Sequence, residues 1–472
     1  MADLSLNIIW NEARKTLDDL THLAMDRTVR LAVTGLNQSG KTVFITSLIH
    51  QLLNANAGVG LPFFQVVNSG RLRGAKIILQ PDMDIPFFRY DQFIQPLLSA
   101  RPNWPNATDG ISEIRLALRF QPDGMLRKSF SSGSTLYLDI IDYPGEWLLD
   151  LPMLDQDFQT WSQQIFQLCH EEPRRALSAK WRQYLSGLKL FHIAQEETLR
   201  QATQLYTEFL HACKSKEVGL NFLQPGRFFV PGEFKDTPLL TFCPLEIVPG
   251  PVTPGSIQDI MTQRFESYKE RVVGQFFKKH FSSFDRQIVL IDLLKALNYG
   301  PWHFADTRNA LTAILESFNY GQSNIISRLF KPKIDKLLFA ATKVDHVAAN
   351  QHHNLERLVN RLVIKPANDA VYLGVEVKTM AISSMVCTET VVREHEGRRL
   401  SFVQGTPKGR DQEILLFPGE IPENLPTPAD WAENRFNFLE FKPRPAMDAE
   451  SGQLPHIRLD QALEFLLGDK LL

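Results

Sequence analysis

The feature that most constrains this chain is an eight-residue glycine loop between a short apolar run and a helical pattern. Its letters GLNQSGKT, at residues 35–42, satisfy the pattern GxxxxGK(S/T). Residues 29–34 before it predict a buried strand, and residues 41–53 after it predict a helix. A strand, a glycine turn and a helix in this order direct main-chain N–H groups at a bound anion, which favours polyphosphate. The chain is therefore predicted to fold around a P-loop.

Each fixed position of this loop has a physical role. Gly35 and Gly40 allow backbone conformations that other residues rarely adopt. Lys41 would place a positive charge at the terminal phosphates, and Thr42 would offer its hydroxyl to Mg²⁺. The predicted nucleotide contacts come from the loop and the first residues of its helix: Gly35, Asn37, Gln38, Ser39, Gly40, Lys41, Thr42 and Val43.

A second motif, DxxG, ends the apolar run LYLDIIDYPG at residues 136–145. Asp142 would hold Mg²⁺ through water, and the amide of Gly145 would contact the terminal phosphate and report its presence. An isolated DxxG is often only a surface turn. Its position at the end of a strand, after a phosphate loop, favours a metal and switch element. A switch threonine is expected before the preceding strand, and Thr108 is the candidate for a catalytic and metal-binding role, with a polar loop residue as the alternative.

A third motif, TKVD at residues 342–345, follows another apolar strand and matches (N/T)KxD. The carboxylate of Asp345 would accept two hydrogen bonds from the donor edge of guanine, which adenine lacks. Lys343 would lie along the base. Ala381 and Ile382 are weaker candidates for contacts to the base through main-chain amides. The order of the three motifs predicts guanine-nucleotide binding.

The remaining pattern predicts an α/β fold with a mixed, mostly parallel sheet. Residues 111–120 and 134–142 indicate a hairpin, and strand-like and helical runs alternate after residue 286. Residues 146–285 indicate a large, mainly helical insertion. The predicted organisation, in chain order, is an N-terminal helix at 1–28, core at 29–145, helical insertion at 146–285, core at 286–384, a loop-rich extension with a small hairpin at 385–455, and a C-terminal core helix at 456–472.

Composition removes several classes of function. A net charge of −2 supplies no field to hold a polyanion, so no nucleic-acid partner is expected. The four cysteines lie far apart, which argues against a disulfide framework or a zinc site. No apolar run is long enough to predict a transmembrane segment. A cytoplasmic location follows, with peripheral membrane contact left open.

These motifs resemble the YcjX-like family of bacterial P-loop GTPases. The likeness rests on residues 26–53, 61–67, 104–120, 139–154, 342–345 and 457–471. It implies a Ras-like core with a helical insertion, GTP as substrate, GDP as product, Mg²⁺ as cofactor, and a bacterial cytosolic setting connected with stress response. A protein partner is expected, with the inner membrane surface as one place for that contact.

One departure concerns catalysis. Ras-like enzymes have a glutamine directly after DxxG, whereas this chain has Glu146. An anion beside the terminal phosphate is unfavourable unless it acts as a base or faces elsewhere, so slow GTP hydrolysis is expected. No arginine finger can be assigned. The candidates within the chain are Arg71, Arg73, Arg115 and Arg127, for which surface ion pairs are the alternative.

Two other functions fit the same motifs. A kinase acting on a small molecule would need an acceptor pocket and an arginine-rich lid, which the acid-balanced insertion does not clearly provide. A non-catalytic scaffold would use the nucleotide for stability alone. Glu146 keeps this second alternative open.

Overall fold

The structure is a computed structural model that describes residues 27–36, 38–55, 60–106, 110–123, 133–247, 251–319, 334–395, 397–433, 435–445 and 454–472. Residues 1–26 of the predicted N-terminal helix, together with Asn37, Thr108 and Arg127, lie outside the described residues, and residues 27 and 28 belong to a strand.

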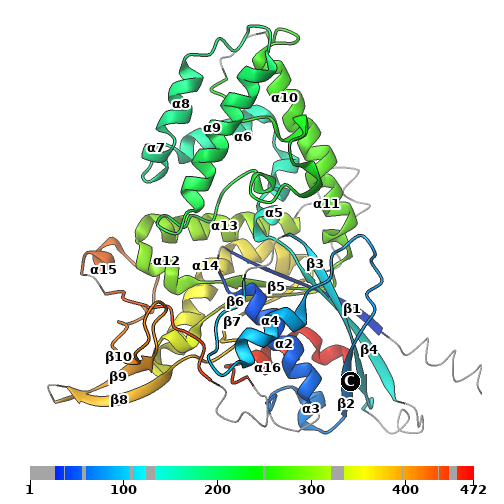
Figure 1. Cartoon of the computed structure of the whole chain (residues 1–472), viewed down its shortest axis with the longest axis vertical. Coiled ribbons are helices and arrows are strands. Elements are labelled where there is room, and N and C mark those ends of the chain that lie inside the picture. Colours follow the sequence, from blue (N-terminus) through cyan, green and yellow to red (C-terminus); the bar gives the residue numbers. More distant parts are fainter. Residues whose placement is uncertain are drawn as a thin grey trace, which may run out of the picture.

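A seven-stranded mixed sheet forms the centre of the molecule (Figure 1), with strand order β2-β3-β4-β1-β5-β6-β7. Neighbours from β4 to β7 run parallel, whereas β2, β3 and β4 are joined by antiparallel pairs. The predicted fold class is confirmed. The strands are β1 (Arg27–Gly35), β2 (Leu72–Ile78), β3 (Ser112–Phe120), β4 (Ser134–Asp142), β5 (Arg286–Ile291), β6 (Lys336–Ala341) and β7 (Glu376–Ala381).

The helices α2 (Lys41–Asn54) and α16 (Leu459–Leu467) cover one face of this sheet. Every other residue of β1 points to them, because side chains alternate along a strand, and Leu31 and Val33 are fully buried there. Two shorter helices, α3 (Gln65–Asn68) and α4 (Tyr90–Leu98), lie beside α2. The C-terminal helix therefore belongs to the same core as the helix that opens at the P-loop.

The opposite face is covered by α12 (Leu293–Tyr299), α13 (Pro301–Asn319) and α14 (His352–Tyr372). Further helices stand beyond this layer, away from the sheet (Figure 1). Their apolar side chains join those of the sheet in one continuous buried cluster. These helices are α5 (Gly145–Leu149), α6 (Phe158–Leu168), α7 (Arg174–Leu177), α8 (Ala179–Ser186), α9 (Glu196–Lys214), α10 (Ile257–Tyr268) and α11 (Gly274–Lys279).

The segment after β7 contains a second small sheet. Its order is β10-β9-β8, with β8 at Glu389–His395, β9 at Arg398–Gly405 and β10 at Ile414–Leu416. A hairpin was expected here, and the structure adds a third strand. One short helix, α15 (Pro428–Ala432), follows. Among the described residues, none of the helices is both long enough and apolar enough to cross a bilayer.

Sequence reasoning missed or shortened some elements. The edge strand β2 was not predicted, because its half-exposed pattern carries Arg73 and Lys76 among its apolar residues. Residues 286–293 predict a strand, but β5 ends at Ile291, and Asp292 caps α12 through its side chain. Residues 354–363 predict a helix, but α14 continues through Pro366 to Tyr372.

Candidate functional site

All three motifs lie at the carboxyl edge of the sheet. The P-loop follows β1, DxxG follows β4 and TKVD follows β6. Because β4, β1, β5 and β6 are parallel neighbours in this order, their carboxyl ends meet at one edge. The end of β5 lies between the P-loop and TKVD, which adds Asp292 to the same edge.

The P-loop is held in a tight turn at the end of β1. The amide of Ser39 donates to the carbonyl of Leu36 at 3.1 Å, and the amide of Leu36 donates to Leu290 of β5 at 3.0 Å. Gly40 has φ 84°, a left-handed conformation that favours glycine. A β-carbon on Gly35 would overlap the Ser39 hydroxyl. These two glycines are therefore needed for the turn itself.

Lys41 and Asp142 are brought into direct contact. The Lys41 ammonium lies 2.7 Å from a carboxylate oxygen of Asp142 and donates to the carbonyl of Tyr143 at 2.8 Å. The Asp142 side chain is almost fully buried. The P-loop cation and the DxxG acid thus form one charged pair beneath the loop.

The residues around this pair suit Mg²⁺. Thr42 supplies a hydroxyl and Asp142 a carboxylate, both hard oxygen donors of the kind that Mg²⁺ prefers. Ser112 lies opposite Asp142 in the β3–β4 register. Its buried hydroxyl has no hydrogen-bond partner within the described part of the chain, so a further oxygen remains for a hydrated ion. Sequence reasoning did not identify Ser112, because the register alone brings it to Asp142.

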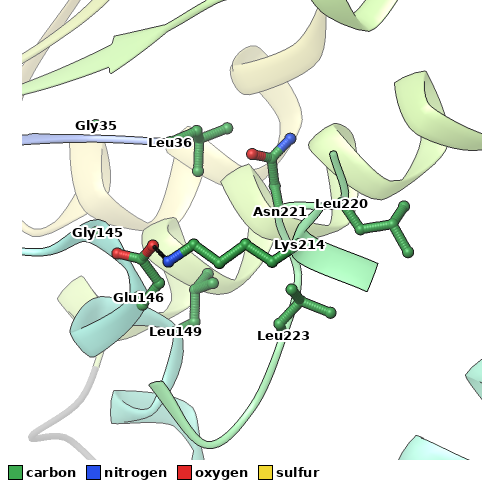
Figure 2. A pocket seen from close by; sticks show the side chains of 9 residues that line it. All are labelled: Gly35, Leu36, Gly145, Glu146, Leu149, Lys214, Leu220, Asn221 and Leu223. Carbon is green, nitrogen blue, oxygen red and sulfur yellow. Dashed lines mark hydrogen bonds and ion pairs between the residues drawn. The ribbon is translucent and has the colours of Figure 1, made fainter. Parts of the chain in front are cut away.

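Gly145 lies against the P-loop. A β-carbon at Gly145 would overlap the carbonyl oxygen of Gly35, so only glycine allows the two segments this close. The next residue, Glu146, forms an ion pair with Lys214 at the end of α9, with 2.5 Å between the ammonium nitrogen and a carboxylate oxygen (Figure 2). Burial raises the pKa of the Glu146 carboxyl, but the positive charges of Lys214 and Lys41 outweigh this effect, so its pKa lies below the ordinary value.

Asp345 of TKVD is buried and hydrogen-bonded at the end of β6. One carboxylate oxygen accepts from the Ser383 hydroxyl at 2.7 Å, and the other accepts from the Cys387 amide at 2.7 Å. Both donors are neutral and come from the segment after β7. They leave the remaining lone pairs of a fixed carboxylate for other donors.

Lys343 is held by two acids. Its ammonium lies 2.6 Å from Asp292 and 2.9 Å from Glu440. Burial lowers the pKa of Lys343, but the two carboxylates outweigh it and raise that pKa. Glu440 also pairs with Lys408, and although burial raises its pKa, the two lysines lower it to about 2. Glu440 of the C-terminal segment therefore lies against Lys343 of TKVD.

Ala381 and Ile382 are fully buried at the end of β7. The amide of Ile382 donates to Ala341 at 2.8 Å, and its carbonyl accepts from the amide of Val344 at 3.2 Å. The amide of Ile382 is thus already engaged within the sheet, and a contact from it to a base would require this bond to open.

The remaining arginine candidates are engaged away from the P-loop. Arg115 pairs with Asp139 on the neighbouring strand, and Arg71 donates to Leu471 and Gln121. Arg73 also donates to the side chain of Gln121. Arg115 thus forms an ion pair, although its partner Asp139 is buried, whereas Arg71 and Arg73 form hydrogen bonds in place of the expected surface ion pairs within the described part of the chain.

Sequence reasoning found no role for Lys214 or Glu440. Each reaches its partner across many residues of chain, 68 from Lys214 to Glu146 and 97 from Glu440 to Lys343. Asp292 could have been found, since it stands at a strand end and three residues before Lys295, whose amide it caps at 3.0 Å.

The mixed sheet, the P-loop at its carboxyl edge and the added helices define a P-loop NTPase with a Ras-like core. The chain matches the YcjX-like family, DUF463, over residues 29–471. It is 44% identical over 465 residues to the "Ras-like GTPase YcjX" of Escherichia coli (strain K12), covering 97% of this chain and 99% of the relative. It is also 42% identical over 492 residues to the "Ras-like GTPase YcjX" of Shewanella oneidensis, covering 100% and 99%. This chain therefore belongs to the YcjX-like family.

Proposed function

We propose that this chain binds GTP with Mg²⁺ and hydrolyses it slowly to GDP and phosphate. The observation that carries the proposal is the meeting of the P-loop, Asp142 and Asp345 at one edge of the sheet. Two relatives of nearly the same length are named Ras-like GTPases, which supports the same reaction class.

The phosphates would bind to the amides of the P-loop and to Lys41. The amides of Gln38, Ser39 and Gly40 belong to the turn that opens α2, whose N-terminus favours an anion. An incoming phosphate would compete with Asp142 for the Lys41 ammonium. Asp142 would then be available to hold Mg²⁺ through water, with Thr42 as the second oxygen donor.

Guanine would be selected by Asp345. Its carboxylate is held in place by Ser383 and Cys387, so it costs little further ordering to accept from the two donors on the edge of guanine. Adenine offers no matching pair of donors, so it would make neither of these hydrogen bonds. Lys343, held by Asp292, would lie along the base.

In hydrolysis, a water oxygen forms a bond to the terminal phosphorus. The bond between that phosphorus and the oxygen that bridges the last two phosphates breaks. GDP, inorganic phosphate and a proton leave. Slow turnover is proposed because Glu146 occupies the position after Gly145 and its carboxylate is bound by Lys214, rather than presenting a neutral amide to water.

The helical segment would change its arrangement with the nucleotide. Gly145 touches Gly35, and Glu146 pairs with Lys214 of α9. The amide of Gly226 donates to both oxygens of Asp150 at 2.9 and 2.8 Å. A shift of Gly145 toward a terminal phosphate would therefore move residues that the helical segment contacts directly.

The base assignment is tested by measuring GTP and ATP affinities of the wild type and of Asp345→Ala. The wild type should prefer GTP, and the variant should lose that preference by a factor of roughly 100, since two hydrogen bonds to a charged acceptor are lost. Asp411→Ala is a matched control, because the Asp411 side chain is fully exposed and pairs with Lys442 at the surface. A strong ATP preference that Asp345→Ala leaves unchanged would remove the assignment.

A scaffold that binds nucleotide without turnover is the second candidate, and the Glu146–Lys214 pair favours it. Release of phosphate from GTP, measured with and without Mg²⁺, separates the two. If the wild type binds GTP but releases no more phosphate than Lys41→Ala does, the GTPase function is excluded and the scaffold function is supported.

We further propose that the protein acts in the bacterial cytoplasm during stress, with a protein partner that recognises one nucleotide state. Its membership of a bacterial family supports the setting. Fractionation of cells before and after heat shock tests this location, and recovery of the chain only in the membrane fraction would contradict it.

A further inference from the structure

Lys214 brings a positive charge from the helical segment to the P-loop. It is the last residue of α9, and its side chain is extended toward Glu146, beside Gly145 and Gly35 (Figure 2). Its ammonium also lies 4.5 Å from the centre of the Phe229 ring, which supports the side chain from one side. A lysine from outside the sheet thus ends within the phosphate-binding region.

The Glu146 carboxylate stands in the field of two lysines. It contacts Lys214 at 2.5 Å, and the Lys41 ammonium also stabilises its charged form. Lys41 is the residue that a P-loop directs to the terminal phosphates. The Glu146 carboxylate is therefore an anion bound by Lys214, in a cavity that Gly35 and Leu36 of the P-loop also line.

The space beside the Glu146–Lys214 pair is small. Gly35, Gly145, Glu146, Lys214 and Asn221 are among the residues that line a cavity of about 10 Å³. This is about the room for one water molecule, and less than a phosphoryl group needs. A phosphoryl group could enter this cavity only if residues that line it, Glu146 and Lys214 among them, moved apart.

We propose that Glu146 takes the place of the terminal phosphate, and that Lys214 contacts that phosphate once GTP binds. Lys214 then exchanges the carboxylate for phosphate oxygens and neutralises the charge that spreads over them during hydrolysis. This inference rests on the proposed GTPase function. It supplies a cation that the described candidates Arg71, Arg73 and Arg115 do not bring to the P-loop, and it gives α9 a direct contact with the terminal phosphate.

The proposal predicts opposite effects for the two halves of the ion pair. Lys214→Gln removes the cation, so affinity for a non-hydrolysable GTP analogue should fall about tenfold while GDP affinity stays within twofold. Glu146→Gln removes the competitor and leaves Lys214 in place, so analogue affinity should rise severalfold. Lys214→Arg should keep most of the analogue affinity, and Lys214→Gln should also hydrolyse GTP at least tenfold more slowly in a single turnover.

The experiment is calorimetric titration of each full-length variant with GDP and with the analogue, in Mg²⁺. Lys180→Gln is the matched control, because Lys180 pairs with Glu208 of α9 at 3.2 Å but both side chains are well exposed. It should bind both ligands like the wild type. If the ion pair only held α9 in place, loss of either partner would change the analogue affinity in the same direction. Analogue affinities that shift in the same direction in Lys214→Gln and Glu146→Gln therefore overturn the proposal.

Two outcomes distinguish this inference from the proposed function. A wild type that binds neither GDP nor the analogue contradicts the proposed function itself. A wild type that binds both, with an analogue-to-GDP ratio that Lys214→Gln leaves unchanged, contradicts only the role of Lys214. If Lys214→Gln does not fold by circular dichroism, Glu146→Gln decides alone, and a ratio that does not rise overturns the proposal.

Discussion

The two ends of the candidate site are built in different ways. At the phosphate end, two lysines are each bound by an acid, Lys41 by Asp142 and Lys214 by Glu146. At the base end, the acid Asp345 is bound by the neutral donors of Ser383 and Cys387. One end holds compensated charge, and the other holds an oriented acceptor.

This difference follows from what each end would recognise. A phosphate is a strong anion, and it binds by replacing an internal carboxylate at a cation. A purine edge is neutral and differs between guanine and adenine only in its donors and acceptors, so discrimination needs an acceptor in a set position. We therefore expect charge to determine affinity at the phosphate end, and the position of the Asp345 carboxylate to determine selectivity at the base end.

The two ends are also supported by different added segments. The helical segment reaches the phosphate end through Lys214 and Gly226. The residues after β7 reach the base end through Ser383, Cys387 and Glu440. Substitutions in each added segment therefore act first on the end that the segment contacts.

The largest effect is expected from removing the P-loop charge. Lys41→Ala should weaken GTP and GDP alike by a factor on the order of 100 or more, because the cation nearest the terminal phosphates is lost. Titration calorimetry with both nucleotides measures this, with the exposed Lys180→Ala as control. A loss below tenfold would show that main-chain amides, rather than charge, dominate the phosphate end.

The contact between the helical segment and DxxG should come next. A β-carbon at Gly226 would overlap the carbonyl oxygen of Glu146, and both are backbone positions that cannot turn aside. Gly226→Ala should therefore lower the free energy of unfolding by about 1–3 kcal/mol.

Urea unfolding measures this change, and Gly187→Ala is its matched control. A β-carbon at Gly187 would meet only the Tyr184 carbonyl, at 3.5 Å, and its φ of −85° suits alanine. That variant should stay within about 0.5 kcal/mol of the wild type. Equal stability of both variants would mean that the helical segment does not press on residues after Gly145.

A smaller effect is expected from removing one of the hydrogen bonds that hold the Asp345 carboxylate. Ser383→Ala removes the hydroxyl that donates to Asp345, worth about 1 kcal/mol for one hydrogen bond, so GTP affinity should fall about fivefold with little change for ATP. Ser47→Ala is the comparison, since its hydroxyl donates to the Ser384 carbonyl instead. Ser47→Ala should lower stability without altering the ratio of GTP to ATP affinities, and a reduced ratio in both variants would deny Ser383 a special role.

The smallest effect concerns the acid that closes over Lys343. Because the pKa of Glu440 is about 2, below the ordinary 4.5, folding favours its charged form. Its stabilisation is present above pH 4.5 and is lost as pH falls toward 2. The side chain is 41% exposed, so solvent screening limits the contribution to about 0.5–1 kcal/mol.

Glu440→Gln should therefore be slightly less stable than the wild type at pH 7, with a difference that shrinks below about pH 4. Unfolding by urea at a series of pH values measures the gap. A gap that stays constant down to the lowest pH at which both proteins fold would assign the effect to lost packing rather than charge.

The sequence alone determined the elements that depend on neighbouring residues. The strand, glycine turn and helix of the P-loop are contiguous in the chain. Gly35 at the end of the strand and Gly40 before the helix indicate the turn between them. The alternation of buried strands and helices predicted the mostly parallel sheet. The meeting of DxxG and TKVD with the loop at one edge follows from the parallel strands of the structure, whose carboxyl ends lie together.

Only the tertiary structure decided the partners of the charged side chains. Lys214, Glu440 and Ser112 have no local pattern that distinguishes them from solvated surface residues. Their positions depend on the path of the helical segment, on the return of the C-terminal segment and on the β3–β4 register. Such contacts join residues far apart in the chain, so packing of whole elements selects them and neighbouring residues do not.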